Sequence, residues 1–266
     1  DALICTSNSV KKNVEFVLES KKRYLKDELN LTNFTEPKLP VIPLGINTKE
    51  FQSSDNIRQL ARKSLDIDQN TLVVLYVGRL SFHAKANPVP MYLAVEKAAK
   101  LNPNKKIKII ECGWYSNAWI KDAFFELSKN ILDVSELIYI DGRNQEQLKI
   151  AWDSADIFCS FSDNIQETFG ISPIEAMASG LPVVVSDWDG YKESVRDEVD
   201  GFRIPSIMLE GGFGSDLAMS YAMELNYYDR YIGKTSTFVA IDIDHAVVRL
   251  DQLFKSEELR KTLGQN

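Results

Sequence analysis

The sequence predicts an α/β protein built on a doubly wound parallel sheet. Short apolar runs rich in β-branched residues alternate with longer segments of helical periodicity along most of the chain. The runs are almost continuously apolar, which is typical of strands that helices bury on both faces. The composition agrees, because 44% of the 266 residues are apolar and 26% are charged, as in an ordinary globular protein.

The first 44 residues are predicted to form a small separate unit. Residues 2–5 read as a short apolar strand, residues 6–9 as a polar turn with N-cap residues, and the next segment has helical spacing. Its lysines are interspersed with acidic residues, so we interpret it as a solvated helix face. Residues 37–46 hold three prolines and a glycine, which excludes a helix. We therefore place a domain boundary between residues 44 and 45.

Strands and helices are expected in turn over residues 45–266. The predicted strands are the runs TLVVLYV, KIKII, ELIYI, DIFCSF and LPVVVS. The predicted helices between them are PMYLAVEKAAKLN, NAWIKDAFFELSKN, NQEQLKIAWDSA and SPIEAMASG. Further on, residues 211–215 read as a flexible break, YAMELNYYDRYIG as helix and turn, and TFVAID as one more strand. Because parallel sheets bind ligands at the carboxyl ends of their strands, the loops that follow the runs are the places to search for a site.

Charge and cysteine content argue against several classes of function. Basic residues number 31 and acidic residues 38, and this net charge of −7 argues against nucleic-acid binding. Cys5, Cys112 and Cys159 lack disulfide or zinc-ligand spacing and are interpreted as buried, reduced thiols of a cytoplasmic protein. No apolar stretch approaches the roughly 18 residues that span a bilayer, so a membrane would be contacted only peripherally.

The loop after TLVVLYV has the chemistry of a diphosphate clamp. Gly78 ends the strand, and Arg79 and Lys85 follow in the same loop. Glycine lets the backbone approach an anion, arginine offers a fork of donors, and lysine supplies a point charge. The glycine spacings of Walker loops and of dinucleotide-binding folds are both absent.

A second loop combines two carboxylates with a helix start. Glu167 precedes a short helix for which Ser172, Pro173 and Glu175 predict a capping box. The backbone N–H groups of Gly170 and Ile171 just precede that helix and suit a phosphate or a sugar hydroxyl. Carboxylates accept hydrogen bonds from vicinal hydroxyls, so the loop suits a ligand with hydroxyls beside a phosphate.

The segment ETFGISPIEAMASGLPVV at 167–184 resembles the E-x7-E signature of retaining GT-B glycosyltransferases and is most similar to family 4. The resemblance extends to GRL and the lysine at 78–85, to YIDG at 139–142 and to DGF at 200–202. It implies that residues 45–266 form the C-terminal, Rossmann-like nucleotide-sugar donor domain, and that residues 1–44 end the acceptor-side domain. It also implies transfer of a sugar from a nucleotide diphosphate to an acceptor hydroxyl.

The resemblance assigns a role to each matching residue. Arg79 and Lys85 would contact the donor diphosphate, Glu175 the ribose hydroxyls, and Glu167 the transferred sugar. The implied catalytic residues are Arg79, Lys85 and Glu167, and the implied donor-binding residues are Gly78, Arg143, Phe169, Gly170, Ile171 and Glu175. Arg143 is included because it falls in the loop where the family contacts the base.

The resemblance implies no cofactor and no essential metal. Asp187-Trp188-Asp189 matches the D-x-D of metal-dependent GT-A enzymes, but it follows the E-x7-E helix, where a GT-B enzyme has a donor loop. The two histidines, His83 and His245, are too few for a histidine metal cluster, and neither stands in a nucleophile motif.

The expected partners are a nucleotide sugar and an acceptor that is a glycan, a lipid or a small molecule. Most of the acceptor domain is expected to be missing, so the chain alone is not expected to catalyse transfer, and any membrane contact would come through the missing domain. Two alternatives stay open: an epimerase or phosphorylase of the same fold, and a non-catalytic module that binds nucleotide sugars.

Overall fold

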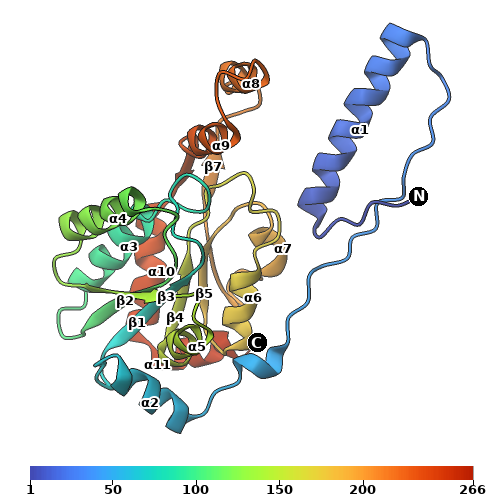
Figure 1. The fold of residues 1–266 in the computed structure, drawn as a ribbon. Coiled ribbons are helices and arrows are strands. Elements are labelled where there is room, and N and C mark those ends of the chain that lie inside the picture. The colour runs from blue at the N-terminus through green and yellow to red at the C-terminus, as the bar shows by residue number, and fades with distance from the viewer. Residues whose placement is uncertain (266) are drawn as a thin grey trace.

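The computed structural model describes residues 1–265 and has the expected parallel α/β core. Its main sheet has six parallel strands in the order β3-β2-β1-β4-β5-β6 (Figure 1). The strands are β1 Leu72–Val77, β2 Ile107–Gly113, β3 Glu136–Asp141, β4 Ile157–Ser160, β5 Val183–Ser186 and β6 Gly201–Ile204. The five apolar runs predicted as strands are β1 to β5, and β6 extends the sheet beside β5.

Helices cover both faces of this sheet, so the prediction of a doubly wound fold is confirmed. One face packs against α3 Val89–Lys100, α4 Ala118–Ile131, α10 Ile243–Lys255 and α11 Glu257–Gly264. The other packs against α5 Gln145–Ser154, α6 Ile171–Ala178 and α7 Tyr191–Ser194, with α2 Asp55–Ser64 lying on α5. Alternation along β1 shows why both faces are apolar: Val74 belongs to the first core and Val73 and Leu75 to the second, all fully buried.

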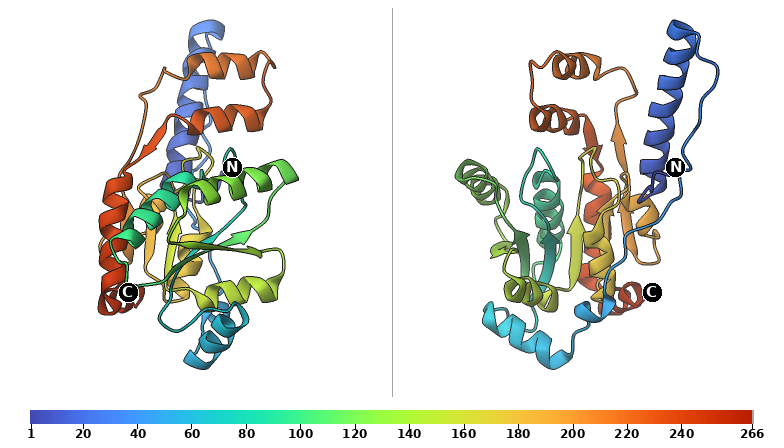
Figure 2. Two further views of the ribbon diagram at one scale, coloured as in Figure 1. Left: turned by 90° about the vertical axis from the view of Figure 1, so that its left-hand side faces the viewer. Right: turned by 45° about the vertical axis from the view of Figure 1, so that its right-hand side comes forward.

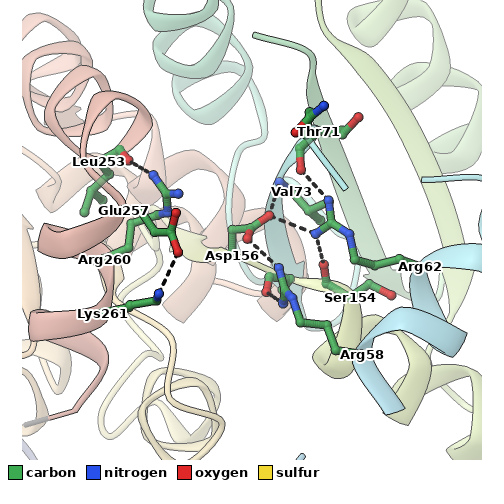
Figure 3. A network of polar contacts seen from close by, with 12 residues as sticks. Arg58, Arg62, Thr71, Val73, Ser154, Asp156, Leu253, Glu257, Arg260 and Lys261 are labelled. Atoms are coloured by element: carbon green, nitrogen blue, oxygen red, sulfur yellow. Dashed lines mark hydrogen bonds and ion pairs between the residues drawn. The ribbon is translucent and has the colours of Figure 1, made fainter. Parts of the chain in front are cut away.

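A buried arginine fastens α2 to the sheet (Figure 3). Arg62, only 1% exposed, donates to the backbone oxygens of Ser154 at 3.0 Å and Asp68 at 2.9 Å. It also pairs at 3.1 Å with Asp156, whose carboxylate accepts the Val73 backbone N–H at 2.8 Å. These contacts join α2, the start of β1 and the segment before β4.

Residues 1–44 form α1 Asn8–Leu29 and an extended segment at residues 30–44, which we call the strap. Both stand apart from the sheet (Figure 1). Ser7 caps α1 by accepting from the Val10 N–H at 3.1 Å, as predicted for residues 6–9. Residues 37–46 contain no helix, and the 3-10 helix η1 Thr48–Phe51 follows. None of the α1 residues is buried, which agrees with a solvated helix.

A helical hairpin follows β6. We call residues 206–241 the α8–α9 hairpin: β7 Ser206–Met208 pairs antiparallel with β8 Val239–Ile241 and encloses α8 Ser215–Ala222 and α9 Tyr228–Ser236. The segment YAMELNYYDRYIG, expected to form helix and turn, contains the end of α8, a turn and the start of α9, and β8 lies within the predicted strand TFVAID. A turn separates the two helices. In it, Glu224 has a φ of 60°, and the Asn226 amide donates a hydrogen bond to the Ser220 hydroxyl.

The three cysteines are buried and free, as predicted. Among the helices of residues 1–265, none is both long and apolar enough to cross a membrane.

Candidate functional site

The candidate site lies where the strand order changes direction. β1 pairs with β2 on one side and with β4 on the other, so the loops after β1 and β4 leave the sheet side by side at its carboxyl edge. This is the crevice in which open parallel sheets bind ligands. Both loops that the sequence singled out, residues 78–85 and 166–170, are these loops.

The loop after β1 brings two cations to this edge. Gly78 continues the ladder by donating to the Cys112 carbonyl at 3.0 Å. Arg79 is exposed and donates to the Ala84 carbonyl at 3.1 Å, so the loop closes on itself. Lys85 is partly buried and forms an ion pair with Glu167. Two residues 82 positions apart in the sequence are thereby joined.

Glu167 is an almost fully buried carboxylate. Besides Lys85, its side chain accepts a hydrogen bond from the Ser162 hydroxyl at 3.4 Å. Its carbonyl accepts the Gly190 N–H at 3.0 Å, which ties the loop after β4 to the loop after β5. The site therefore holds an ammonium and a carboxylate in contact, able to serve a phosphate and a hydroxyl respectively.

Helix α6 starts in this loop with its N-terminus free of a side-chain cap. Gly170 is the N-cap at a φ of 77°, and a Cβ there would lie 2.1 Å from the Tyr191 ring, so only glycine fits. The predicted capping box is wrong: Ser172 is the second residue of the helix and makes no cap bond. The first turn of α6 holds no acidic residue, which leaves its positive end for an anion.

Glu175 lies one turn into α6 and is half-buried. Burial raises the pKa of its carboxyl, and no hydrogen bond or ion pair from another described residue reaches that side chain. Phe169 is also half-buried, and Ile171 is 39% exposed at the helix start. The structure thus gathers Gly78, Arg79, Lys85, Glu167, Phe169, Gly170, Ile171 and Glu175 in two neighbouring loops and one helix.

Arg143 lies apart from them. It follows β3, which β2 separates from β1, and its guanidinium pairs with Asp141 at 2.6 and 2.9 Å. That pair lowers the pKa of Asp141 to about 2. Arg143 shares the carboxyl edge of the sheet but does not contact the Lys85–Glu167 pair.

The two carboxylates of the D-x-D sequence face different partners. Asp187 pairs with Arg203 at 3.6 Å, and Asp189, at a φ of 39°, is hydrogen-bonded by Ser9. Within residues 1–265, no three His, Cys, Asp or Glu side chains converge as a metal site would require.

Sequence reasoning missed two residues that shape the site. Asp163 is buried behind the loops, accepts the Asn87 N–H at 3.4 Å and has its pKa raised to about 7 by burial. Asn164 donates to the His83 carbonyl at 3.1 Å and accepts the Trp188 indole N–H at 2.9 Å, so it joins three loops. Their position just after the predicted strand DIFCSF was the available signal.

Comparison with known proteins gives one family. The profile described as Glycosyl transferases group 1 matches residues 57–207. An uncharacterized glycosyltransferase, MJ1607, from Methanocaldococcus jannaschii is 29% identical over 183 residues, covering 68% of this chain and 44% of its own. A D-inositol 3-phosphate glycosyltransferase from Corynebacterium aurimucosum is 25% identical over 196 residues, covering 73% of this chain and 46% of its own. The chain spans less than half the length of both relatives.

Solved structures share the fold. WaaG, a glycosyltransferase involved in lipopolysaccharide biosynthesis, superimposes with a TM-score of 0.60 at 18% identity, over 87% of this chain and 51% of its own. Anabaena Alr3699/HepE, solved with UDP and glucose, gives 0.54 at 17% identity, over 96% of this chain and 63% of its own.

Proposed function

The chain belongs to the glycosyl transferases group 1 family, and we propose that its carboxyl-edge site binds the nucleotide-sugar donor of a glycosyl transfer to an acceptor hydroxyl. The observation that carries the proposal is the Lys85–Glu167 pair beside the uncapped start of α6, at the point where the strand order reverses. Two structural neighbours share this fold: WaaG is a glycosyltransferase by name, and Alr3699/HepE was solved with UDP and glucose.

In the proposed reaction, the diphosphate lies between two sources of positive potential. Arg79 and Lys85 face it from the loop after β1, and the N-terminus of α6 faces it from the other side. As the bond to the sugar breaks, negative charge grows on the diphosphate, and these fixed groups stabilise it. Glu175 accepts hydrogen bonds from the ribose hydroxyls, Glu167 accepts hydrogen bonds from hydroxyls of the transferred sugar, and Arg143 contacts the base.

We further propose that the transfer retains the anomeric configuration, as in family 4. The acceptor oxygen attacks from the face that the diphosphate leaves, and its hydroxyl proton passes to the departing diphosphate oxygen. The transfer requires no metal in this proposal, since the cationic side chains of Arg79 and Lys85 neutralise the diphosphate. A cytoplasmic location fits the three free, buried thiols. We assign peripheral contact with a membrane to the acceptor side.

Thermal-shift titration tests the donor site, because a ligand that binds only the folded state raises its stability. We expect one of UDP, GDP or ADP, with its glucose conjugate, to raise the Tm of the chain, with or without a chelator. Lys85→Met and Glu175→Gln should weaken that binding by about ten-fold or more, the size of a lost charge-assisted hydrogen bond.

Exposed residues of the same types provide matched controls. Lys129→Met and Glu146→Gln, on the outer faces of α4 and α5, should leave nucleotide affinity unchanged. The proposal is wrong if no nucleotide or conjugate stabilises the folded chain, or if Lys85→Met and Glu175→Gln bind as well as the wild type.

A further inference from the structure

The α8–α9 hairpin presents tyrosines next to the site. The family profile ends at residue 207, so nearly all of the hairpin lies outside the matched region. The hairpin rises beyond the carboxyl edge of the sheet, the edge that holds the site (Figure 2). Tyr227 and Tyr228 are 70% and 45% exposed there.

Helix α9 contacts both loops of the site. The Gln166 amide donates to the Tyr228 hydroxyl at 2.9 Å, and Gln166 directly precedes Glu167. Gly233 packs on the other loop, because a Cβ at that position would lie 2.8 Å from the Cβ of His83. The hairpin is therefore a neighbour of the Lys85–Glu167 pair and not a remote appendage.

The Tyr228 ring is held by its own helices. Tyr221 of α8 stacks on Tyr231 of α9 with ring centroids 5.1 Å apart, and Tyr228 lies 5.8 Å from Tyr221. Aromatic contacts of this kind fix the rings in place. The hydroxyl of Tyr228 is thus presented to Gln166 by a packed cluster.

The order of the elements along the carboxyl edge indicates which part of the ligand would lie near the hairpin. Arg143 follows β3 at one side of the sheet, the Lys85–Glu167 pair lies at β1 and β4, and the hairpin follows β6 at the other side. A nucleotide sugar is a linear molecule of base, diphosphate and sugar. The proposed donor site has the base near β3 and the diphosphate at the centre, and in that arrangement the sugar points toward the hairpin.

The charges of the hairpin suit a sugar better than a phosphate. Residues 208–239 contain four acidic residues and two basic ones: Glu210, Asp216, Glu224, Asp229, Arg230 and Lys234. Tyrosines offer ring faces to C–H groups and hydroxyls to other hydroxyls. An uncharged sugar meets these groups without electrostatic cost.

We propose that the α8–α9 hairpin is the outer wall of the subsite for the transferred sugar, and that Tyr228 is a positioning residue that holds Gln166 beside Glu167. The inference rests on the proposed donor site and adds an element that selects the sugar. It requires the hairpin to affect binding of the sugar conjugate while leaving binding of the bare nucleoside diphosphate unchanged.

Calorimetric titration of the full chain with UDP, UDP-glucose and UDP-N-acetylglucosamine, or with the GDP or ADP series if the thermal screen selects it, separates these effects. Tyr228→Phe keeps the ring cluster and removes one hydroxyl. We expect about five-fold weaker binding of the preferred conjugate, the size of one neutral hydrogen bond, with diphosphate binding unchanged. Tyr24→Phe, the same change at an exposed tyrosine on α1 and outside the hairpin, should alter neither.

Gln166→Ala completes a double-mutant cycle. Because Tyr228 acts through Gln166, the double variant should lose no more affinity than Gln166→Ala alone. Equal binding of both conjugates by wild type and Tyr228→Phe overturns the inference, as does an equal loss for diphosphate and conjugate, or conjugates that bind wild type no better than the diphosphate. Failure of wild type to bind any nucleotide refutes the donor site itself, which is a distinct result.

Discussion

Two carboxyl groups are buried close to the site, at Glu111 on β2 and Asp163 after β4. Glu111 is 1% exposed and accepts a hydrogen bond from the Tyr92 hydroxyl at 2.5 Å, while its other oxygen has no partner among the described residues. Burial raises the pKa of both groups to about 7. Each is therefore a group that the folded chain holds protonated at mildly acidic pH.

The raised pKa of Glu111 predicts a pH-dependent stability. The folded state binds the extra proton between pH 4.5, the ordinary pKa, and about 7, so stability falls as pH rises through that range. Glu111→Gln keeps an acceptor for Tyr92 and removes the titration. The free energy of unfolding of the variant, relative to wild type, should rise by on the order of 2 kcal/mol between pH 5 and pH 8.

Urea denaturation at several pH values measures this difference. Glu126→Gln, the same substitution at an exposed glutamate on α4, serves as the control, and the change with pH for Glu111→Gln should exceed the change for this variant. If the free energy of unfolding of Glu111→Gln, relative to wild type, does not change with pH, Glu111 titrates normally in the folded chain.

At the scale of single elements, helix α6 shows where local sequence signals end. Ser172, Pro173 and Glu175 predict a capping box, yet the helix begins at Ile171. The Tyr191 ring occupies the space that a side chain at Gly170 would need, and this contact spans 21 residues of sequence. Tertiary packing therefore determines the residue at which α6 begins. Because the helix begins at Ile171, the Glu175 carboxylate has no capping role.

The contacts of Arg62 attach α2 to the sheet, and we expect their loss to lower the stability of the fold. Arg62 joins α2 to Asp156 and to three backbone carbonyls, those of Ser154, Asp68 and Thr71 (Figure 3). Arg62→Met keeps the apolar stem but leaves these buried acceptors short of donors. We expect a loss of about 3 kcal/mol in the free energy of unfolding, measured by urea denaturation.

An exposed ion pair on the same side chain network provides the comparison. Lys106 pairs with Asp68 at 3.0 Å, and both side chains are largely exposed. Lys106→Met should lower the free energy of unfolding much less than Arg62→Met does, because exposed ion pairs contribute little. Similar losses for the two variants would show that the burial of Arg62 adds nothing to its contribution.

At the scale of the whole molecule, the strands of the sheet could be predicted from the sequence, whereas the packing of the α8–α9 hairpin could not. Strands β1 to β5 are apolar runs whose burial on two faces follows from their own residues, and the rule for carboxyl ends brings Lys85 and Glu167 to one edge. Tyr228 belongs to no motif, and its contact with Gln166 depends on how a 36-residue hairpin folds back. Such contacts come from packing and not from any local pattern.

The predicted boundary at residues 44 and 45 is tested by removing residues 1–44. This segment buries only Cys5 and Ser7, and few hydrogen bonds join it to residues 45–265. Ser7 donates to the Thr168 carbonyl at 2.6 Å, and Ser9 also bonds Asp189. Glu193 accepts the backbone N–H groups of Asn8 and Ser9 at 2.8 and 2.7 Å and the Asn8 amide at 2.8 Å. Each such bond contributes about 1 kcal/mol at most. Residues 45–266 should therefore still unfold in one cooperative transition, with a Tm lowered by less than about 10 °C.

The opposite deletion is the control for this experiment, because it is shorter and yet removes core. Helices α10 and α11, within residues 243–264, supply Leu250, Leu253 and Phe254 to the first core, all fully buried. Burial of each such side chain contributes about 2 kcal/mol, so their joint loss exceeds the stability of an ordinary domain once the exposed sheet face is counted. A chain that ends at residue 242 should show no cooperative melting by circular dichroism. If instead residues 45–266 fail to fold, α1 and its strap are part of the donor domain, and the boundary belongs elsewhere.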